Sequence, residues 1–165
     1  MVSMQPTPSN PRAPWDRELA LARIREHLDR EGPLLPILHA LQEEFGYIDQ
    51  AAEPLIAAEL NISRAEVHGV ITFYHDFRRA PAGRHLLKLC RAEACQAAGG
   101  EPLAQRAEAR LGVRMGGTAA DGSVTLEPVY CLGLCALAPS AMLDGRVVAR
   151  LDHERLEALL AEAQR

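Results

Sequence analysis

The sequence is poor in aromatic residues and has no excess of basic charge. Its 165 residues include three Tyr, three Phe and one Trp, and the formal net charge is -4. Proteins that bind nucleic acids need a basic surface for the phosphates, and many also use aromatic side chains for base stacking. The composition therefore argues against a nucleic-acid partner.

Long apolar runs are also missing. The first 14 residues contain four prolines and no apolar segment of the kind that a secretory signal requires. No later stretch approaches the roughly 20 apolar residues of a membrane span. We therefore expect a cytoplasmic protein without direct membrane insertion, and we interpret residues 1–14 as a flexible tail.

Nucleotide-binding and dithiol motifs are absent as well. Neither Gly99-Gly100 nor Gly116-Gly117 has the spacing of a dinucleotide-binding or Walker loop. There is no Cys-x-x-Cys, so nothing suggests disulfide exchange. We expect no catalytic residue in this chain, and any hydride or flavin chemistry would belong to another subunit.

What the chain does contain is four cysteines, Cys90, Cys95, Cys131 and Cys135, all within one stretch of the sequence. Structural disulfides are rare in the reducing cytoplasm, so cysteines there more often bind metals or take part in chemistry. These four residues are the candidate site.

Residues 15–79 have the apolar periodicity of helices. Leu21, Ile24 and Leu28 recur at helical spacing, and a second series of apolar residues spans 34–45. The spacing predicts two helices in this part of the chain.

Two further helices are indicated by capping signals. Asp49 is a candidate N-cap for a third helix that runs to Leu60, and Ser63 with Glu66 forms the pattern of a capping box for a fourth. Residues 15–79 therefore predict a small helical bundle.

A change of pattern follows the segment Ala80-Pro81-Ala82-Gly83, which has the composition of a linker. The elements expected after it are a strand at 85–90, a helix at 102–111, a strand at 123–130, a hairpin at 140–150 that turns at Asp144-Gly145, and a last helix capped by Asp152. This order predicts an α/β domain with a small mixed sheet over residues 80–165. The fold class is therefore α+β, with the helical bundle first.

The cysteine spacings predict two loops. Five helical steps turn about 500°, so Cys90 and Cys95 would diverge on one helix and must meet on a loop that leaves the first strand. Cys131 and Cys135 follow the next strand, and Gly133 between them favours a compact turn. Two such loops facing each other would form a cage of four thiolates.

Thiolates suit both zinc and iron–sulfur clusters. The second pair has a spacing that zinc sites use, whereas the first pair is wider than is usual for zinc. The wider loop fits a two-iron cluster better. Structural zinc and redox-active thiols or disulfides remain alternatives at this point.

The same residues carry a resemblance to a known family. The motifs are Cys90-x4-Cys95, an interval of 35 residues, Cys131-Leu-Gly-x-Cys135, Ala138-Pro139, the Asp144-Gly145 turn, and the segments 41–48 and 67–74 of the helical half. Together they resemble the thioredoxin-like 2Fe-2S ferredoxin family. That family includes the 24 kDa-type subunit of NADH:quinone oxidoreductase and related subunits of bidirectional hydrogenases and NAD-dependent formate dehydrogenases.

Within the family, two segments are most similar to the gamma subunit of NAD-dependent formate dehydrogenase. They are Tyr74-His-Asp-Phe-Arg78 and Cys90-Arg-Ala-Glu-Ala-Cys95, in which Glu93 stands where many respiratory members have Thr. The resemblance implies a thioredoxin-like second domain and one 2Fe-2S cluster held by the four cysteines.

The resemblance also implies partners. The chain would be an electron-transfer subunit of a heteromeric complex and would exchange single electrons with FMN on a flavin- and NAD-binding subunit. A separate subunit with a molybdenum or tungsten cofactor would oxidise formate. The alternatives are the equivalent subunit of NADH:quinone oxidoreductase or a bidirectional hydrogenase, and a zinc-stabilised interaction protein.

Overall fold

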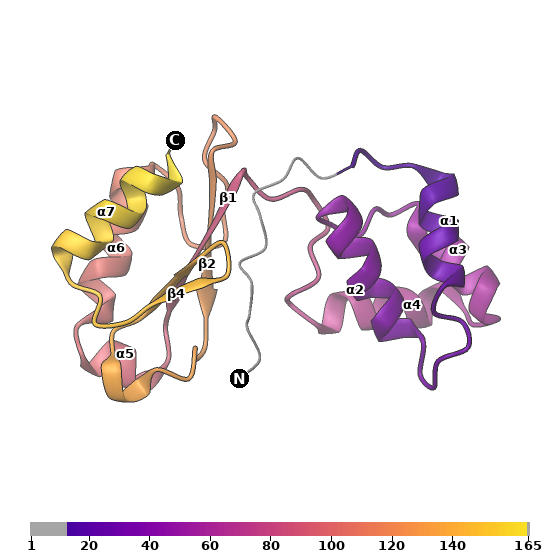
Figure 1. Ribbon diagram of the computed structural model, residues 1–165, viewed down its shortest axis with the longest axis horizontal. Coiled ribbons are helices and arrows are strands. Elements are labelled where there is room, and N and C mark those ends of the chain that lie inside the picture. Colours follow the sequence, from indigo (N-terminus) through magenta and orange to yellow (C-terminus); the bar gives the residue numbers. More distant parts are fainter. Residues whose placement is uncertain (1–12, 165) are drawn as a thin grey trace. The chain divides into compact units, whose positions relative to one another are not determined.

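The computed structural model describes residues 13–164, which divide into two compact units (Figure 1). The first unit comprises residues 13–81 and the second comprises residues 82–164. Each unit has its own cluster of buried apolar side chains. Apart from residues 13 and 14, the predicted tail lies outside the described residues.

Within the described residues, the first unit contains four helices, α1 (Arg17–Arg25), α2 (Leu34–Phe45), α3 (Ala52–Leu60) and α4 (Arg64–Phe73). Apolar side chains from all four helices form its core. Those fully or almost fully buried include Ile24, Ile37, Leu38, Leu41, Phe45, Ile56, Val67 and Ile71. The predicted helical bundle is confirmed.

Local signals set several helix ends in this unit. The Ser63 hydroxyl accepts a hydrogen bond from the Glu66 N–H, and the Glu66 carboxylate accepts one from the Ser63 N–H, so the predicted capping box is present. Gly46 ends α2 with φ of 84°, a left-handed conformation that glycine adopts without steric cost.

Two predicted boundaries in this unit are wrong. Helix α1 ends at Arg25, because the next residues form tighter bonds such as His27 N–H to Ile24 C=O, and Leu28 packs against the core from the following turn. Helix α3 begins after Ala51, and the Asp49 side chain accepts a hydrogen bond from the Ala51 N–H at 2.8 Å. Asp49 thus organises the turn before the helix rather than its first turn.

Glu53 is a buried acid in α3. Its carboxylate contacts the Arg79 guanidinium and lies 3.3 Å from His68 Nδ1. Burial alone would raise the pKa of Glu53, but the hydrogen bonds and charges of Arg79 and His68 outweigh it and lower the pKa. The ionised carboxylate therefore stabilises the folded helical unit.

We expect Glu53→Gln to lower the free energy of unfolding by about 1–3 kcal/mol at neutral pH, since a charged hydrogen bond in a buried site is lost. A carboxylate whose pKa is lowered on folding contributes fully above its unfolded pKa, and the contribution disappears as pH falls through the folded pKa. The deficit should therefore shrink in acid. Urea titrations at several pH values measure it, with the exposed Glu43→Gln as the matched control. A deficit independent of pH would contradict the assignment.

The second unit is a mixed sheet with helices. Its described elements are β1 (His85–Cys90), α5 (Glu93–Ala97), α6 (Gly100–Leu111), β2 (Val124–Val129), a 3-10 helix η1 (Cys135–Leu137), β3 (Ala141–Leu143), β4 (Arg146–Val148) and α7 (His153–Ala163). The strand order is β2-β1-β3-β4, with β1 parallel to β2 and antiparallel to β3. The predicted small mixed sheet is confirmed.

Strand register places the core on one face of this sheet. Leu87 of β1 is paired with Leu126 of β2 and with Leu143 of β3, and all three side chains are buried. Helices α6 and α7 lie along that side of the sheet (Figure 1). Buried residues of both helices, among them Ala107 and Leu160, complete the cluster.

Local signals in this unit also match the prediction in part. Asp144-Gly145 forms the hairpin turn between β3 and β4, and the Asp152 side chain caps α7 by accepting from the Arg155 N–H at 2.8 Å. Helix α6, however, begins at Gly100, two residues before the predicted start at Pro102. Proline is tolerated in a first helical turn, where its missing N–H would have no intrahelical partner.

Candidate metal centre

Both cysteine loops leave the sheet at the same edge. Strands β1 and β2 are parallel and in register from His85↔Val124 to Cys90↔Val129. Parallel strands that end together release their following loops side by side, so the segment after Cys90 emerges beside the segment that contains Cys131. The segments that carry the two cysteine pairs therefore leave the sheet at the same end.

The first pair of cysteines is buried. Cys90 is the last residue of β1, and Cys95 lies in the short helix α5, where only 2% of its surface is exposed. The expected loop after the first strand is short, because it ends at Ala92 and residues Glu93–Ala97 form helix α5, which carries Cys95. The helix starts after Cys90, so the two side chains are not constrained by a shared helical axis.

The second pair is exposed. The Cys131 and Cys135 sulfur atoms are 3.6 Å apart, and the Gly133 N–H donates a hydrogen bond to Cys131 Sγ at 3.3 Å. Cys131 has a φ of 120°, a conformation that L-residues rarely adopt and that costs of order 1–3 kcal/mol. Residues held in such conformations cluster at functional sites.

Contacts between the loops join the two pairs. The Cys90 thiol is hydrogen-bonded by the Ala92 N–H of its own loop and by the Leu132 N–H of the other loop, and it also contacts Cys95. Charges on Cys90 and Cys95 act on Cys135. The two pairs therefore influence each other electrostatically, and all four cysteines are free thiols.

The electrostatics of the two pairs differ. Burial raises the pKa of Cys90, but hydrogen bonds from Ala92, Cys95, Ser140 and Leu132 together lower the pKa. The pKa of Cys135 is raised, chiefly by its hydrogen bond to Cys131 and by Coulombic repulsion from that neighbouring cysteine. Four thiolates in one place repel one another, so holding all four ionised requires positive charge among them.

The donor set fits a two-iron cluster. Four thiolates in two pairs are the ligands of a 2Fe-2S cluster, whose ferric ions supply the missing positive charge. Among residues 13–164, no group of three or more Cys, His, Asp or Glu side chains lies close enough together to hold a metal ion as the side chains stand. The fit to a cluster therefore rests on the type and pairing of the four thiolates.

Three contacts of the site were not predicted from sequence. They are the backbone hydrogen bonds of Ala92 and Leu132, which lower the pKa of Cys90, and the hydroxyl of Ser140, which lies 3.6 Å from Cys95 Sγ. The amides depend on loop conformation, and Ser140 depends on the pairing of β1 with the segment that leads into β3. Among the residues that contact sulfur through an amide or a hydroxyl, only Gly133 was recognised in the sequence, as a turn residue between two cysteines.

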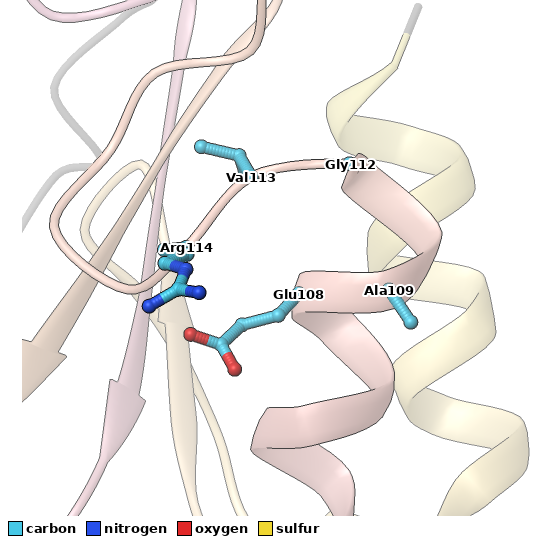
Figure 2. A pocket seen from close by; sticks show the side chains of 5 residues that line it. All are labelled: Glu108, Ala109, Gly112, Val113 and Arg114. Atoms are coloured by element: carbon cyan, nitrogen blue, oxygen red, sulfur yellow. The ribbon is translucent and has the colours of Figure 1, made fainter.

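The surface pocket shown in Figure 2 lies elsewhere in this unit. It is lined by Glu108, Ala109, Gly112, Val113 and Arg114, at the end of α6 and the start of the following loop. The Glu108 and Arg114 side chains extend toward each other, and none of the cysteines lines the pocket. The cysteine group is therefore a site of a different kind, made by loops rather than by a cavity.

A helical unit followed by a mixed α/β unit with four cysteines at one sheet edge defines an iron–sulfur protein of the ferredoxin class. Comparison with known proteins gives the family. The model of the "Thioredoxin-like [2Fe-2S] ferredoxin" family matches residues 20–164, and the chain belongs to this family. One 2Fe-2S cluster is accordingly the cofactor that the cysteine group fits.

Similar proteins are components of larger oxidoreductases. The chain is 36% identical over 144 residues to an NADH-quinone oxidoreductase subunit of Rhizobium meliloti (strain 1021), covering 87% of this chain and 86% of that protein. It is 29% identical over 133 residues to the NADP-reducing hydrogenase subunit HndA of Solidesulfovibrio fructosivorans, covering 81% and 78%.

A solved structure confirms the fold. A chain of an NAD+-reducing [NiFe]-hydrogenase in its air-oxidized state matches with a TM-score of 0.69 and 27% sequence identity. The match covers 79% of this chain but 22% of the hydrogenase chain. The α+β class and the thioredoxin-like second unit are thus confirmed.

Among residues 13–164, none of the helices combines the length and apolar character needed to span a bilayer.

Proposed function

We propose that Cys90, Cys95, Cys131 and Cys135 bind one 2Fe-2S cluster, and that the chain is an electron-transfer subunit of a cytoplasmic NAD-dependent formate dehydrogenase complex. The observation that carries the proposal is the meeting of the two cysteine pairs at one sheet edge in a member of this family. When bound, such a cluster accepts and releases one electron at a time.

The residues of the chain would hold and tune the cluster. The buried pair anchors one side against the sheet, and the exposed pair leaves the other side open to a partner protein. Tyr130, with 73% of its surface exposed, and Leu137 flank the exposed pair in sequence. Contact with a partner there would shorten the distance that an electron must travel.

The proposed partners follow from the chemistry that the chain lacks. Nicotinamide transfers a hydride, and converting a hydride to single electrons requires a flavin. FMN and NAD would be bound by a partner subunit, and formate would react at a molybdenum or tungsten cofactor on another. The support for formate dehydrogenase is the sequence of 74–78 and of the first cysteine loop with Glu93.

A second candidate is the equivalent subunit of NADH:quinone oxidoreductase or of an NAD-linked hydrogenase. It is favoured by the similar proteins, which belong to an NADH-quinone oxidoreductase, an NADP-reducing hydrogenase and an NAD+-reducing [NiFe]-hydrogenase. Both candidates keep the same cluster and the same one-electron role and differ in the complex that contains the chain.

Purification of the full chain from its native host without oxygen tests both the presence of the cluster and the identity of the complex. We expect about two irons and two acid-labile sulfides per chain, an electron paramagnetic resonance signal on reduction, and co-purification with a large molybdenum- or tungsten-containing protein. Recovery of a quinone-reductase or hydrogenase subunit instead would reject the formate assignment and leave the cluster in place. Stoichiometric zinc without sulfide would reject electron transfer and favour a zinc-stabilised interaction protein.

A further inference from the structure

Ser140 is a buried polar residue whose hydroxyl contacts sulfur. Among the described residues, four polar or charged side chains are buried: Glu53, Ser123, Thr125 and Ser140. The first three have nitrogen or oxygen partners. The partners that the structure gives the Ser140 hydroxyl are Cys95 Sγ, at 3.6 Å, and the Cys90 thiol.

The backbone fixes Ser140 beside the buried cysteine pair. Its carbonyl accepts a hydrogen bond from the Cys90 N–H at 3.0 Å. The next residue, Ala141, is paired with Leu89 in the antiparallel ladder between β1 and β3. Ser140 is only 2% exposed, so water does not compete for its hydroxyl. The hydroxyl therefore stays within reach of sulfur.

The direction of this hydrogen bond depends on the state of the cysteines. Between a thiol and a hydroxyl, either group can donate. A cysteine that binds iron is a thiolate and has no proton, so the hydroxyl must be the donor. Such a bond withdraws negative charge from the sulfur.

Withdrawal of charge acts more strongly on the reduced state. A 2Fe-2S cluster with four thiolates carries a charge of about -2 when oxidised and about -3 when reduced. A fixed donor in a water-excluded site stabilises the more negative state more. Hydrogen bonds to cluster sulfurs are one of the known determinants of reduction potential.

We propose that Ser140 is a positioning residue that donates a hydrogen bond to the buried cysteine pair and thereby raises the reduction potential of the cluster. This inference rests on the proposed cluster ligation. The spacing of the four cysteines does not reveal this role of Ser140.

The test uses the full chain with four substitutions. Ser140→Ala removes the hydroxyl. Ser140→Thr and Ser140→Val have nearly the same volume and differ in whether a hydroxyl is present. Ser123→Ala is the matched control, because Ser123 is another buried serine of this unit whose hydroxyl bonds an oxygen, that of Asp121, instead of sulfur.

Spectroelectrochemical titration should show a lower reduction potential in Ser140→Ala than in the wild-type chain. At a fixed potential, the ratio of oxidised to reduced cluster should rise about three- to tenfold, and a tenfold rise corresponds to 59 mV for one electron. Ser140→Thr and Ser123→Ala should keep the wild-type ratio. Electron–nuclear double resonance in H2O and D2O should show one exchangeable proton coupled to the reduced cluster that Ser140→Ala lacks.

Other outcomes overturn the inference. An iron-loaded Ser140→Ala with wild-type potential and the same exchangeable protons would reject the role of Ser140 and leave the cluster proposal intact. If Ser140→Ala does not load with iron, Ser140→Thr is compared with Ser140→Val instead. Equal reduction potentials in these two variants would reject the role of the Ser140 hydroxyl. A wild-type chain without iron and sulfide would overturn the cluster proposal and this inference with it.

Discussion

Replacing Cys90 with alanine is expected to lower the iron and sulfide content of the purified chain at least about tenfold and to abolish its visible absorption. Backbone hydrogen bonds from Ala92 and Leu132, one in each cysteine segment, lower the pKa of the Cys90 thiol and so favour the thiolate that binds iron. Without this thiolate the cluster loses one ligand and those amides lose their acceptor. Iron and sulfide assays with absorption spectra measure the change.

The exposed loop supplies the control for this prediction. Leu137→Ala changes a partly exposed side chain two residues after Cys135 and removes no ligand, so it should retain the cluster. Far-ultraviolet circular dichroism should show that both variants keep their helices. A Cys90→Ala variant with full iron content would contradict the ligand assignment.

Replacing Leu87 with alanine is expected to lower the free energy of unfolding of the second unit by about 2–5 kcal/mol. Leu87 is fully buried at the centre of the sheet, where its register partners Leu126 and Leu143 lie on the same face. Truncation removes apolar contacts and leaves a cavity that the rigid sheet cannot close. Urea denaturation with hydrogen exchange read by mass spectrometry measures the loss.

Hydrogen exchange also separates the two units. The core clusters share no residue, so amides of α2 and α4 in the first unit should keep their wild-type exchange rates in Leu87→Ala. Val147→Ala, at a half-exposed position of β4, should change stability by less than about 0.5 kcal/mol. Equal loss of protection in both units would contradict independent cores.

The two cations nearest to the first cysteine pair in sequence, Lys88 and Arg91, are both paired with acids. Lys88 lies 3.6 Å from Glu127, and Arg91 pairs with Glu101. Each cation next to the site in sequence is therefore partly neutralised by an acid. Within residues 13–164, uncharged donors, namely amides of the two cysteine segments and the Ser140 hydroxyl, contact the sulfur atoms.

Much of the fold could be predicted because its signals are local. The capping box at Ser63, the left-handed Gly46 and the Asp144-Gly145 turn each depend on a few neighbouring residues. Some helix boundaries lie a few residues from their predicted positions, such as the start of α6 at Gly100. Helix α5 was missed because five residues carry too little periodicity to be recognised.

The sequence by itself determined the helical and mixed-sheet units, the four cysteines as one candidate site, and a two-iron cluster as a better fit than zinc. Local spacing and chemical type were sufficient for these conclusions. Only the tertiary structure decided that one cysteine pair is buried and the other exposed, and that Ser140 contacts Cys95 across 45 residues of chain. Those features depend on the parallel pairing of β1 with β2 and the antiparallel pairing of β1 with β3, and long-range strand pairing leaves no local pattern in the sequence.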